Sequence, residues 1–128
     1  MIFGTGCDIV EISRFKKWVG EESLFIERFF NPNERAGDTA SEKRKCEFYA
    51  GRFAAKEAFS KALGTGISGF NLNEVYVAPD GLGKPVFHVT GKALETVEKM
   101  CGKDYRIHVS ISHEKEYAVA NVIIEILK

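Results

Sequence analysis

The feature that most constrains the fold is an uninterrupted helical stretch in the middle of the chain. Residues 40–63 are dense in Ala, Glu, Lys and Arg and contain no proline, which predicts one long helix from Ala40 to Leu63. Gly64 follows as a typical helix-ending residue. Gly51 is its weak point, because glycine in an exposed helix interior costs about 1 kcal/mol relative to alanine. The charged stretch 38–45 allows the helix to begin later.

The segments on both sides of this helix predict strands and shorter helices. Residues 2–12 favour a strand, with Gly4 and Gly6 on one face where another backbone or a ligand can come close. Ser13 is a candidate N-cap for a short helix to Trp18. The further expected elements are a helix over Glu22–Phe30, strands over Leu72–Ala78, Lys84–Thr90, Arg106–His113 and Tyr117–Leu127, and a helix over Lys92–Cys101. Short connections favour antiparallel pairing, so we expect an α+β fold in a single domain, residues 1–128.

Composition excludes several classes of protein. The 128 residues hold 18 Lys and Arg against 18 Asp and Glu, and this zero net charge argues against a nucleic-acid-binding protein with a strongly basic surface. Three cysteines without a CxxC pair are typical of free thiols in a reducing compartment. No apolar run approaches the ~20 residues of a membrane span, and the N-terminus does not resemble a signal peptide. We therefore expect a cytoplasmic protein with no membrane partner.

Asp8 is a charged residue within an apolar strand. Its neighbours Cys7, Ile9 and Val10 predict burial, and a buried carboxylate must be paired or bind a metal. A solvated Asp at a strand edge is an equally good interpretation. Cys7 itself is interpreted as a small buried apolar residue.

Glu57 and Lys61 share one face of the long helix with Tyr49 and Phe53, because steps of four residues return to the same side. An exposed Glu–Lys pair at this spacing would stabilise the helix by only about 0.2–0.5 kcal/mol. The aromatic character of the face makes a pocket lined by both charges a competing interpretation.

The Gly64-Thr65-Gly66 segment directly follows the helix, and its second glycine suggests close backbone approach. It is a weak phosphate motif, because the C-terminal end of a helix carries a negative dipole. An anion bound there would need Lys61 and backbone N–H groups to outweigh that dipole. The three histidines, His88, His108 and His113, do not have the spacing of metal ligands.

Several segments together resemble one family. Residues 48–67 (FYAGRFAAKEAFSKALGTGI) closely resemble the signature of the holo-acyl-carrier-protein synthases, the small bacterial type of 4′-phosphopantetheinyl transferase. The stretch 4–12 with Arg14 looks like that family's first strand. Residues 83–85 (GKP) and 109–113 (VSISH) with Tyr117-Ala118 are similar to two further family segments, in the same order.

The resemblance implies an enzyme that moves the phosphopantetheine arm of coenzyme A onto a serine of apo-acyl carrier protein in fatty acid biosynthesis. Adenosine 3′,5′-bisphosphate would be released. By this resemblance Asp8 and Glu57 hold Mg²⁺, which commonly binds one or two carboxylates plus substrate phosphates; Mn²⁺ suits the same ligands. Lys61 would stabilise or protonate the leaving phosphate. The base that takes the serine proton stays open between a metal-bound water, Glu57 and Asp8.

The resemblance also implies binding residues and an assembly. Those for coenzyme A are Gly64, Thr65, Gly66, Lys84, Pro85 and His113, and those for the acidic carrier protein are Arg14, Arg28 and Arg44. Leu24 stands where related sequences can carry another basic residue. Family members of this size are homotrimers whose active sites are shared between neighbouring subunits.

Two other functions stay open at this point. A different small metal-dependent enzyme of phosphate esters, such as a nucleotide hydrolase, could use Asp8 and Glu57 in a similar way. A non-catalytic module could bind a carrier protein through its arginines alone.

Overall fold

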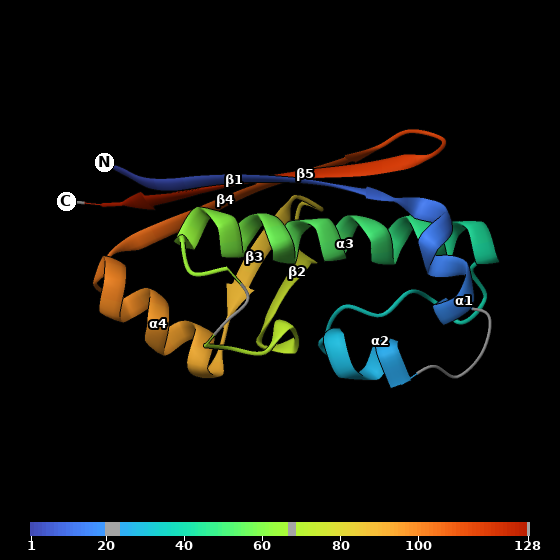
Figure 1. Ribbon diagram of the computed structural model, residues 1–128, viewed down its shortest axis with the longest axis horizontal. Helices are drawn as coiled ribbons and strands as arrows, with labels where there is room; N and C mark the ends of the chain where they lie inside the picture. Colours follow the sequence, from blue (N-terminus) through green and yellow to red (C-terminus); the bar gives the residue numbers. More distant parts are fainter. Residues whose placement is uncertain (20–23, 67–68, 128) are drawn as a thin grey trace.

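A long helix lies along one face of an antiparallel sheet (Figure 1). The computed structural model describes residues 1–19, 24–66 and 69–127. The helix is α3 (Glu42–Leu63), and the sheet has the order β1 (Ile2–Glu11), β5 (Tyr117–Ile126), β4 (Tyr105–His113). The remaining elements are η1 (Ile12–Phe15), α1 (Lys16–Val19), α2 (Leu24–Phe29), η2 (Leu72–Glu74), β2 (Val75–Pro79), β3 (Pro85–Val89) and α4 (Gly91–Cys101).

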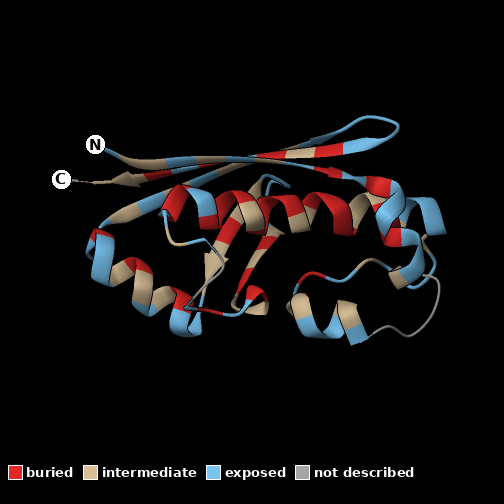
Figure 2. Cartoon of the chain, in the orientation of Figure 1, coloured by how far each residue is buried: buried red, intermediate tan, exposed pale blue. Residues whose placement is uncertain are grey.

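The opposite side of α3 is covered by a second layer, which contains the antiparallel hairpin β2–β3 and α4 (Figure 1). Phe59 of α3 stacks on Phe87 of β3 at 4.8 Å between ring centroids, and it meets Phe70 edge-on at 5.8 Å. Figure 2 accordingly shows buried residues along most of α3. The expected α+β fold with an antiparallel sheet packed on a long helix is confirmed.

The first strand lies unusually close to α3, at its two glycines. A Cβ atom on Gly4 would lie 2.0 Å from the carbonyl oxygen of Ala62, and one on Gly6 would lie 1.9 Å from that of Ala58. No side chain fits in so little space, because real Cβ contacts are never so short. The close approach predicted for these glycines is therefore confirmed, and the partner is the backbone of α3.

The ends of α3 follow ordinary capping chemistry. Ser41 is the N-cap, and its hydroxyl accepts a hydrogen bond from the Arg44 N–H at 3.1 Å, so the helix begins at Glu42 and not at Ala40. Gly64 ends it with φ of 88°, as predicted. The exposed setting predicted for Gly51 is wrong: it is buried, and a Cβ there would lie 2.8 Å from a methyl group of Ile111.

No helix among the described residues is long and apolar enough to cross a membrane.

The shorter elements differ from expectation in two places. Ser13 is not an N-cap: it lies inside η1, whose N-cap is Glu11 without a side-chain hydrogen bond. Residues 72–74 form the 3-10 turn η2 and not strand, because the Asn71 side chain and Glu74 form a capping box. The other predicted strands and α4 are present with ends shifted by one or two residues. Glu22 lies outside the described residues.

Asp8 faces α3 for a reason other than the predicted one. Side chains alternate along β1, so Asp8 shares the inner face with Gly4, Gly6 and Val10, and it lies opposite Ala120 of β5. Cys7 is exposed, so its interpretation as a buried residue is wrong; Ile9 beside it is 63% exposed. Of the neighbours that were expected to bury Asp8, Cys7 and Ile9 point away from it and only Val10 shares its face, so α3 shields it instead.

We expect Gly6→Ala to lower the free energy of unfolding by about 3 kcal/mol or more, because the added methyl group would overlap the Ala58 carbonyl. Urea unfolding followed by circular dichroism measures this difference. Gly81→Ala is the control, since a Cβ there meets nothing within 4 Å and should change stability by less than about 0.5 kcal/mol. Equal stability of the two variants would contradict the close contact.

Candidate active site

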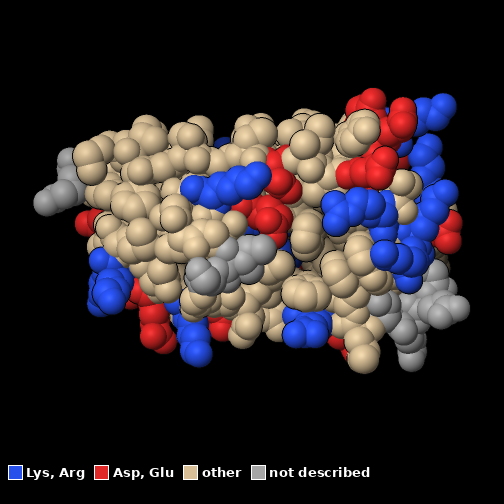
Figure 3. Space-filling model, viewed as in Figure 1, with Lys and Arg blue, Asp and Glu red and all other residues tan. Residues whose placement is uncertain are grey.

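Three charged side chains meet where β1 passes the C-terminal half of α3. The Lys61 ammonium group lies 3.0 Å from Asp8 Oδ1 and donates to the Cys7 carbonyl at 3.1 Å. Glu57 is one helical turn before Lys61, on the same flank of α3. Figure 3 shows acidic and basic side chains side by side over this part of α3. The structure thus brings together Asp8, Glu57 and Lys61, all three of which the resemblance names as catalytic.

The electrostatics of this cluster are those of two acids sharing one cation. Burial raises the pKa of Glu57, and the nearby Asp8 charge raises it further, while Lys61 opposes both effects. The hydrogen bond and charge of Asp8 raise the pKa of Lys61, which therefore stays cationic. Because the two carboxylates repel each other, a further positive charge between them would be stabilised.

The donor set fits a hard divalent cation whose coordination is completed by substrate. Within residues 1–19, 24–66 and 69–127, no group of three or more His, Cys, Asp or Glu side chains could hold a metal by itself. Mg²⁺ does not require such a cage, because one or two carboxylates plus substrate phosphates and waters satisfy it. Asp8 and Glu57 are a pair of this kind, and a cation between them would relieve their repulsion.

The loop after α3 needs glycines because of their positive φ angles and not because of steric contacts with other residues. Gly64 and Gly66 have φ of 88° and 65°, and a Cβ on either would meet none of the described residues within 4 Å, so no protein group in that part of the chain makes the close approach predicted for Gly66. The Gly64 N–H is bound to the carbonyls of Ser60 and Lys61, and the Thr65 hydroxyl donates to the Gly66 carbonyl at 2.9 Å. The loop begins three residues beyond Lys61 and lies at the same end of α3 as the cluster.

A cationic pocket of about 330 Å³ lies on the other flank of α3. Its lining residues are Arg35, Ala36, Gly37, Ala40, Arg44, Glu47, Phe48, Arg52, Ile111 and His113. Arg52 packs over the Phe48 ring at 4.1 Å, and its buried Nε has no hydrogen-bond partner in the described part of the chain. An unpaired buried donor among arginines suits an anion. The sequence hypothesis omitted Arg35 and Arg52, although Arg52 stands inside the signature segment.

The cluster and the pocket lie on opposite sides of the same subunit. Asp8 belongs to one edge strand of the sheet and His113 to the other, with β5 between them, or about 10 Å at the usual strand spacing. Arg52 and Glu57 are five residues apart on α3, which rotates them by about 140° at 3.6 residues per turn. His113 therefore does not reach Lys61 within one chain.

The remaining predicted residues, with the exception of Arg44, lie apart from both places. Lys84 and Pro85 belong to the hairpin between β2 and β3, where Asp80 Oδ1 accepts from the Lys84 N–H at 2.9 Å. Arg14 on η1 and Arg28 on α2 are exposed. Arg44 lines the pocket with His113.

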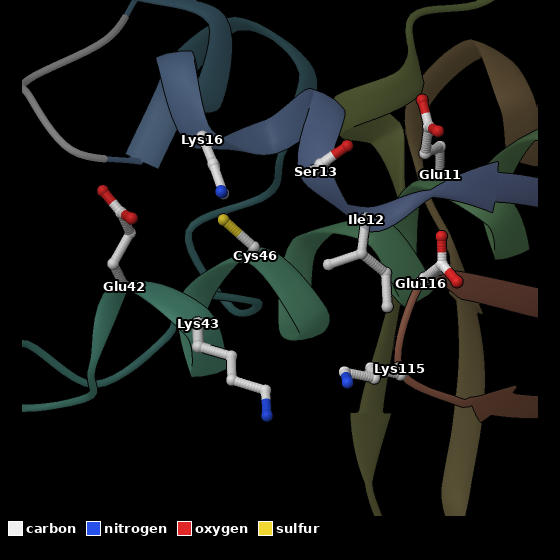
Figure 4. A pocket seen from close by; sticks show the side chains of 9 residues that line it. All are labelled: Glu11, Ile12, Ser13, Lys16, Glu42, Lys43, Cys46, Lys115 and Glu116. Atoms are coloured by element: carbon white, nitrogen blue, oxygen red, sulfur yellow. The ribbon is translucent and has the colours of Figure 1, made fainter.

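A second cavity, of about 370 Å³, lies between η1, α1, the start of α3 and the β4–β5 turn (Figure 4). Lysines and glutamates line it in equal number, and the Cys46 thiol points into it near Lys16 and Glu42. Burial raises the pKa of Cys46, which makes it a poorer nucleophile. The cavity contains no residue of the predicted site.

Comparison with known proteins identifies the class. A family model described as the 4′-phosphopantetheinyl transferase superfamily matches residues 4–122. Solved structures of holo-acyl-carrier-protein synthases have the same fold. The protein from Plasmodium yoelii has a TM-score of 0.81 and 30% identity, covering 97% of this chain and 94% of that one. The protein from Bacillus anthracis, in complex with CoA (3′,5′-ADP), has a TM-score of 0.73 and 39% identity, covering 98% and 97%.

Curated relatives narrow this class. A holo-acyl-carrier-protein synthase of Treponema denticola is 46% identical over 125 residues, covering 98% of this chain and 99% of the relative, and one of Clostridium novyi is 44% identical over 126 residues, covering 98% and 89%. The chain belongs to the holo-acyl-carrier-protein synthase family of 4′-phosphopantetheinyl transferases. The resemblance seen in the sequence motifs is thereby confirmed.

We expect Glu57→Gln to raise the melting temperature at neutral pH by about 2–4 °C in the absence of metal. A raised folded-state pKa means that the fold prefers protonated Glu57, so wild-type stability falls as the pH rises from the usual Glu range through that pKa. The variant should not show this loss. Calorimetry across pH measures it, with the exposed Glu95→Gln on α4 as a control, and identical pH profiles for Glu57→Gln and wild type would contradict the repulsion.

Proposed function

We propose that the chain transfers the 4′-phosphopantetheine group of coenzyme A to a serine of apo-acyl carrier protein in a Mg²⁺-dependent reaction. The observation that carries this proposal is the meeting of Asp8, Glu57 and Lys61 beside the loop that follows α3. Acyl carrier protein is the carrier of fatty acid biosynthesis, so we assign the reaction to that process. We assign it to the cytoplasm, where reducing conditions suit the three free cysteines.

Asp8 and Glu57 would hold the Mg²⁺. When bound there, the ion supplies a Lewis acid that polarises the pyrophosphate of coenzyme A and neutralises charge developing on it. The support from this chain is that the two carboxylates come from a strand and a helix locked together, so their separation is set before substrate binds.

The transfer is a displacement at phosphorus. The serine oxygen of the carrier forms a bond to the phosphorus that bears the pantetheine arm, the bond from this phosphorus to the bridging oxygen breaks, and adenosine 3′,5′-bisphosphate leaves. Lys61 stays cationic because Asp8 raises its pKa, so it stabilises the leaving phosphate by charge. The carboxylates of Asp8 and Glu57, or a water held between them, accept the serine proton.

The nucleotide end of coenzyme A would bind in the cationic pocket. Arg52 has an unpaired buried Nε there, and Arg44 and His113 line the same space, which suits the 3′-phosphate. Arg44 is therefore assigned to the nucleotide and not to the carrier protein. We also assign Lys84 and Pro85 to the nucleotide part of coenzyme A. The loop residues Gly64, Thr65 and Gly66 are assigned to its pyrophosphate.

A complete site on this proposal needs two subunits, because the cluster and the pocket lie on opposite edges of one chain. A head-to-tail contact joins the cluster of one subunit to the pocket of the next, and three such contacts close a ring. The outer sheet face supplies apolar surface for it, since Ile2, Ile9 and Ile123 are 56%, 63% and 37% exposed. We propose a homotrimer with three shared sites.

The carrier protein would dock beside this shared site through exposed basic residues. Arg14 and Arg28 belong to neighbouring short elements, and both are exposed. They complement an acidic helix and would speed association at low salt. Leu24, which is 79% exposed on α2, adds an apolar contact in place of a charge.

We expect mass spectrometry to detect a phosphopantetheine-sized mass gain when apo-acyl carrier protein is incubated with coenzyme A, Mg²⁺ and this chain. Chelation of the metal should abolish the gain, and so should Glu57→Gln while the fold stays intact. Glu95→Gln, an exposed residue of α4, should transfer at the wild-type rate.

The same experiment separates the alternatives. Free nucleotide products without modified carrier would indicate a phosphate-ester hydrolase, and a stable complex without either product would indicate a binding module. Wild-type turnover by Glu57→Gln would overturn the assignment of this residue to the metal.

The shared site predicts complementation between two inactive variants. Lys61→Ala and His113→Ala homotrimers should each be severely impaired, whereas trimers reassembled from an equal mixture should recover about one quarter of wild-type activity, because one site in four combines both intact residues. Initial rates after mixing and refolding measure this recovery. Activity no higher than that of the separate variants would contradict a shared site.

A further inference from the structure

Glu34 is a carboxylate buried in the core, outside the cluster at Lys61, and it is only 1% exposed. It forms an ion pair with Lys56, whose side chain is fully buried. Its oxygens also accept hydrogen bonds from the backbone N–H groups of Asn31, at 3.0 Å, and Val77, at 3.3 Å. Glu34 thus joins the segment after α2 to α3 and to β2.

Lys56 extends this connection to the second layer. Its ammonium group donates to the carbonyl of Leu72 at 2.9 Å and to that of Val75. Its hydrogen-bond and ion-pair partners in the described part of the chain are Glu34, Leu72 and Val75, which are all buried. A pair of this kind is costly to break from one side, because the remaining charge stays buried without a partner.

The residues that follow Glu34 form one wall of the cationic pocket. Arg35, Ala36 and Gly37 line it together with Arg52. Arg35 donates to the carbonyls of Ile26 and Phe30, at 3.2 and 3.3 Å, and the Ala36 N–H donates to the hydroxyl of Tyr49 at 3.1 Å. The wall is therefore held by Glu34, by Arg35 and by Tyr49.

The charge of Glu34 also acts on the pocket. Burial lowers the pKa of the Arg52 guanidinium, and the charge of Glu34 opposes this effect. Arg35 is close enough to Lys56 for the two positive charges to repel each other. Without Glu34, the positive charges of Lys56, Arg52 and Arg35 would lie together without an internal anion.

We propose that Glu34 is a positioning residue for substrate binding: by anchoring the wall 35–37 against α3, it sets the affinity of the cationic pocket for the 3′-phosphate of coenzyme A without taking part in the transfer at Lys61. This rests on the proposed function. A fully apolar core at this point would hold the layers together equally well, but it would offer no acceptor to the Val77 N–H and no charge beside Arg52.

The test compares coenzyme A with 3′-dephospho-coenzyme A as substrates of purified trimer with Mg²⁺. Two variants are used: the double variant Glu34→Gln with Lys56→Met, which leaves no unpaired buried charge, and Tyr49→Phe, which loses only the hydroxyl bonded to Ala36. Each should raise KM for coenzyme A, by about tenfold for the double variant, and raise KM for the dephospho substrate far less, with kcat nearly unchanged. The matched control, Glu95→Gln, should change neither KM.

The outcomes separate the two proposals. An unchanged ratio of the two KM values in folded variants, or a parallel loss of kcat for both substrates, would overturn the positioning role while leaving the transferase function standing. If the double variant does not fold, Tyr49→Phe decides by the same ratio. A wild-type chain that neither transfers nor binds adenosine 3′,5′-bisphosphate in calorimetry would overturn the proposed function, and the role of Glu34 with it.

Discussion

The contact between the two glycines of β1 and the backbone of α3 is the constraint on which the rest of the structure depends. Because Gly4 and Gly6 have no side chain, the strand rests directly on the carbonyls of Ala62 and Ala58. The next inward residue of β1 is then Asp8, whose Oδ1 lies 3.0 Å from the Lys61 ammonium group. One packing contact thus sets both the layer spacing and the geometry of the charged cluster.

Helix α3 also divides the molecule's charge. The acidic pair and Lys61 occupy one flank, at the β1 edge, whereas the pocket with Arg44, Arg52 and His113 occupies the other, at the β4 edge. The net charge of zero does not reveal this separation, because it counts the charged residues without regard to where they lie in the fold. On the proposed function this separation has a consequence: coenzyme A, if it uses both surfaces, would find them together where two copies of the chain meet.

Local patterns predicted most of the fold correctly, and the two errors about burial share one cause. The period-two alternation of β4, the capping glycine at Gly64 and the helical composition of residues 42–63 are properties of neighbouring residues, so they are readable along the chain. The burial of Gly51 and the exposure of Cys7 depend on which element covers which face, and alternation alone cannot decide that.

The sequence by itself determined the family, the long helix and, through the family resemblance, the three residues of the charged cluster, because these stand in contiguous motifs. Only the tertiary structure decided that Arg52 and His113 share a pocket, and that Glu34 and Lys56 form a buried pair. The members of each pair lie more than twenty residues apart in the sequence, and they meet only when the layers of the fold pack together. Such pairings depend on how layers stack, and a linear pattern does not contain that information.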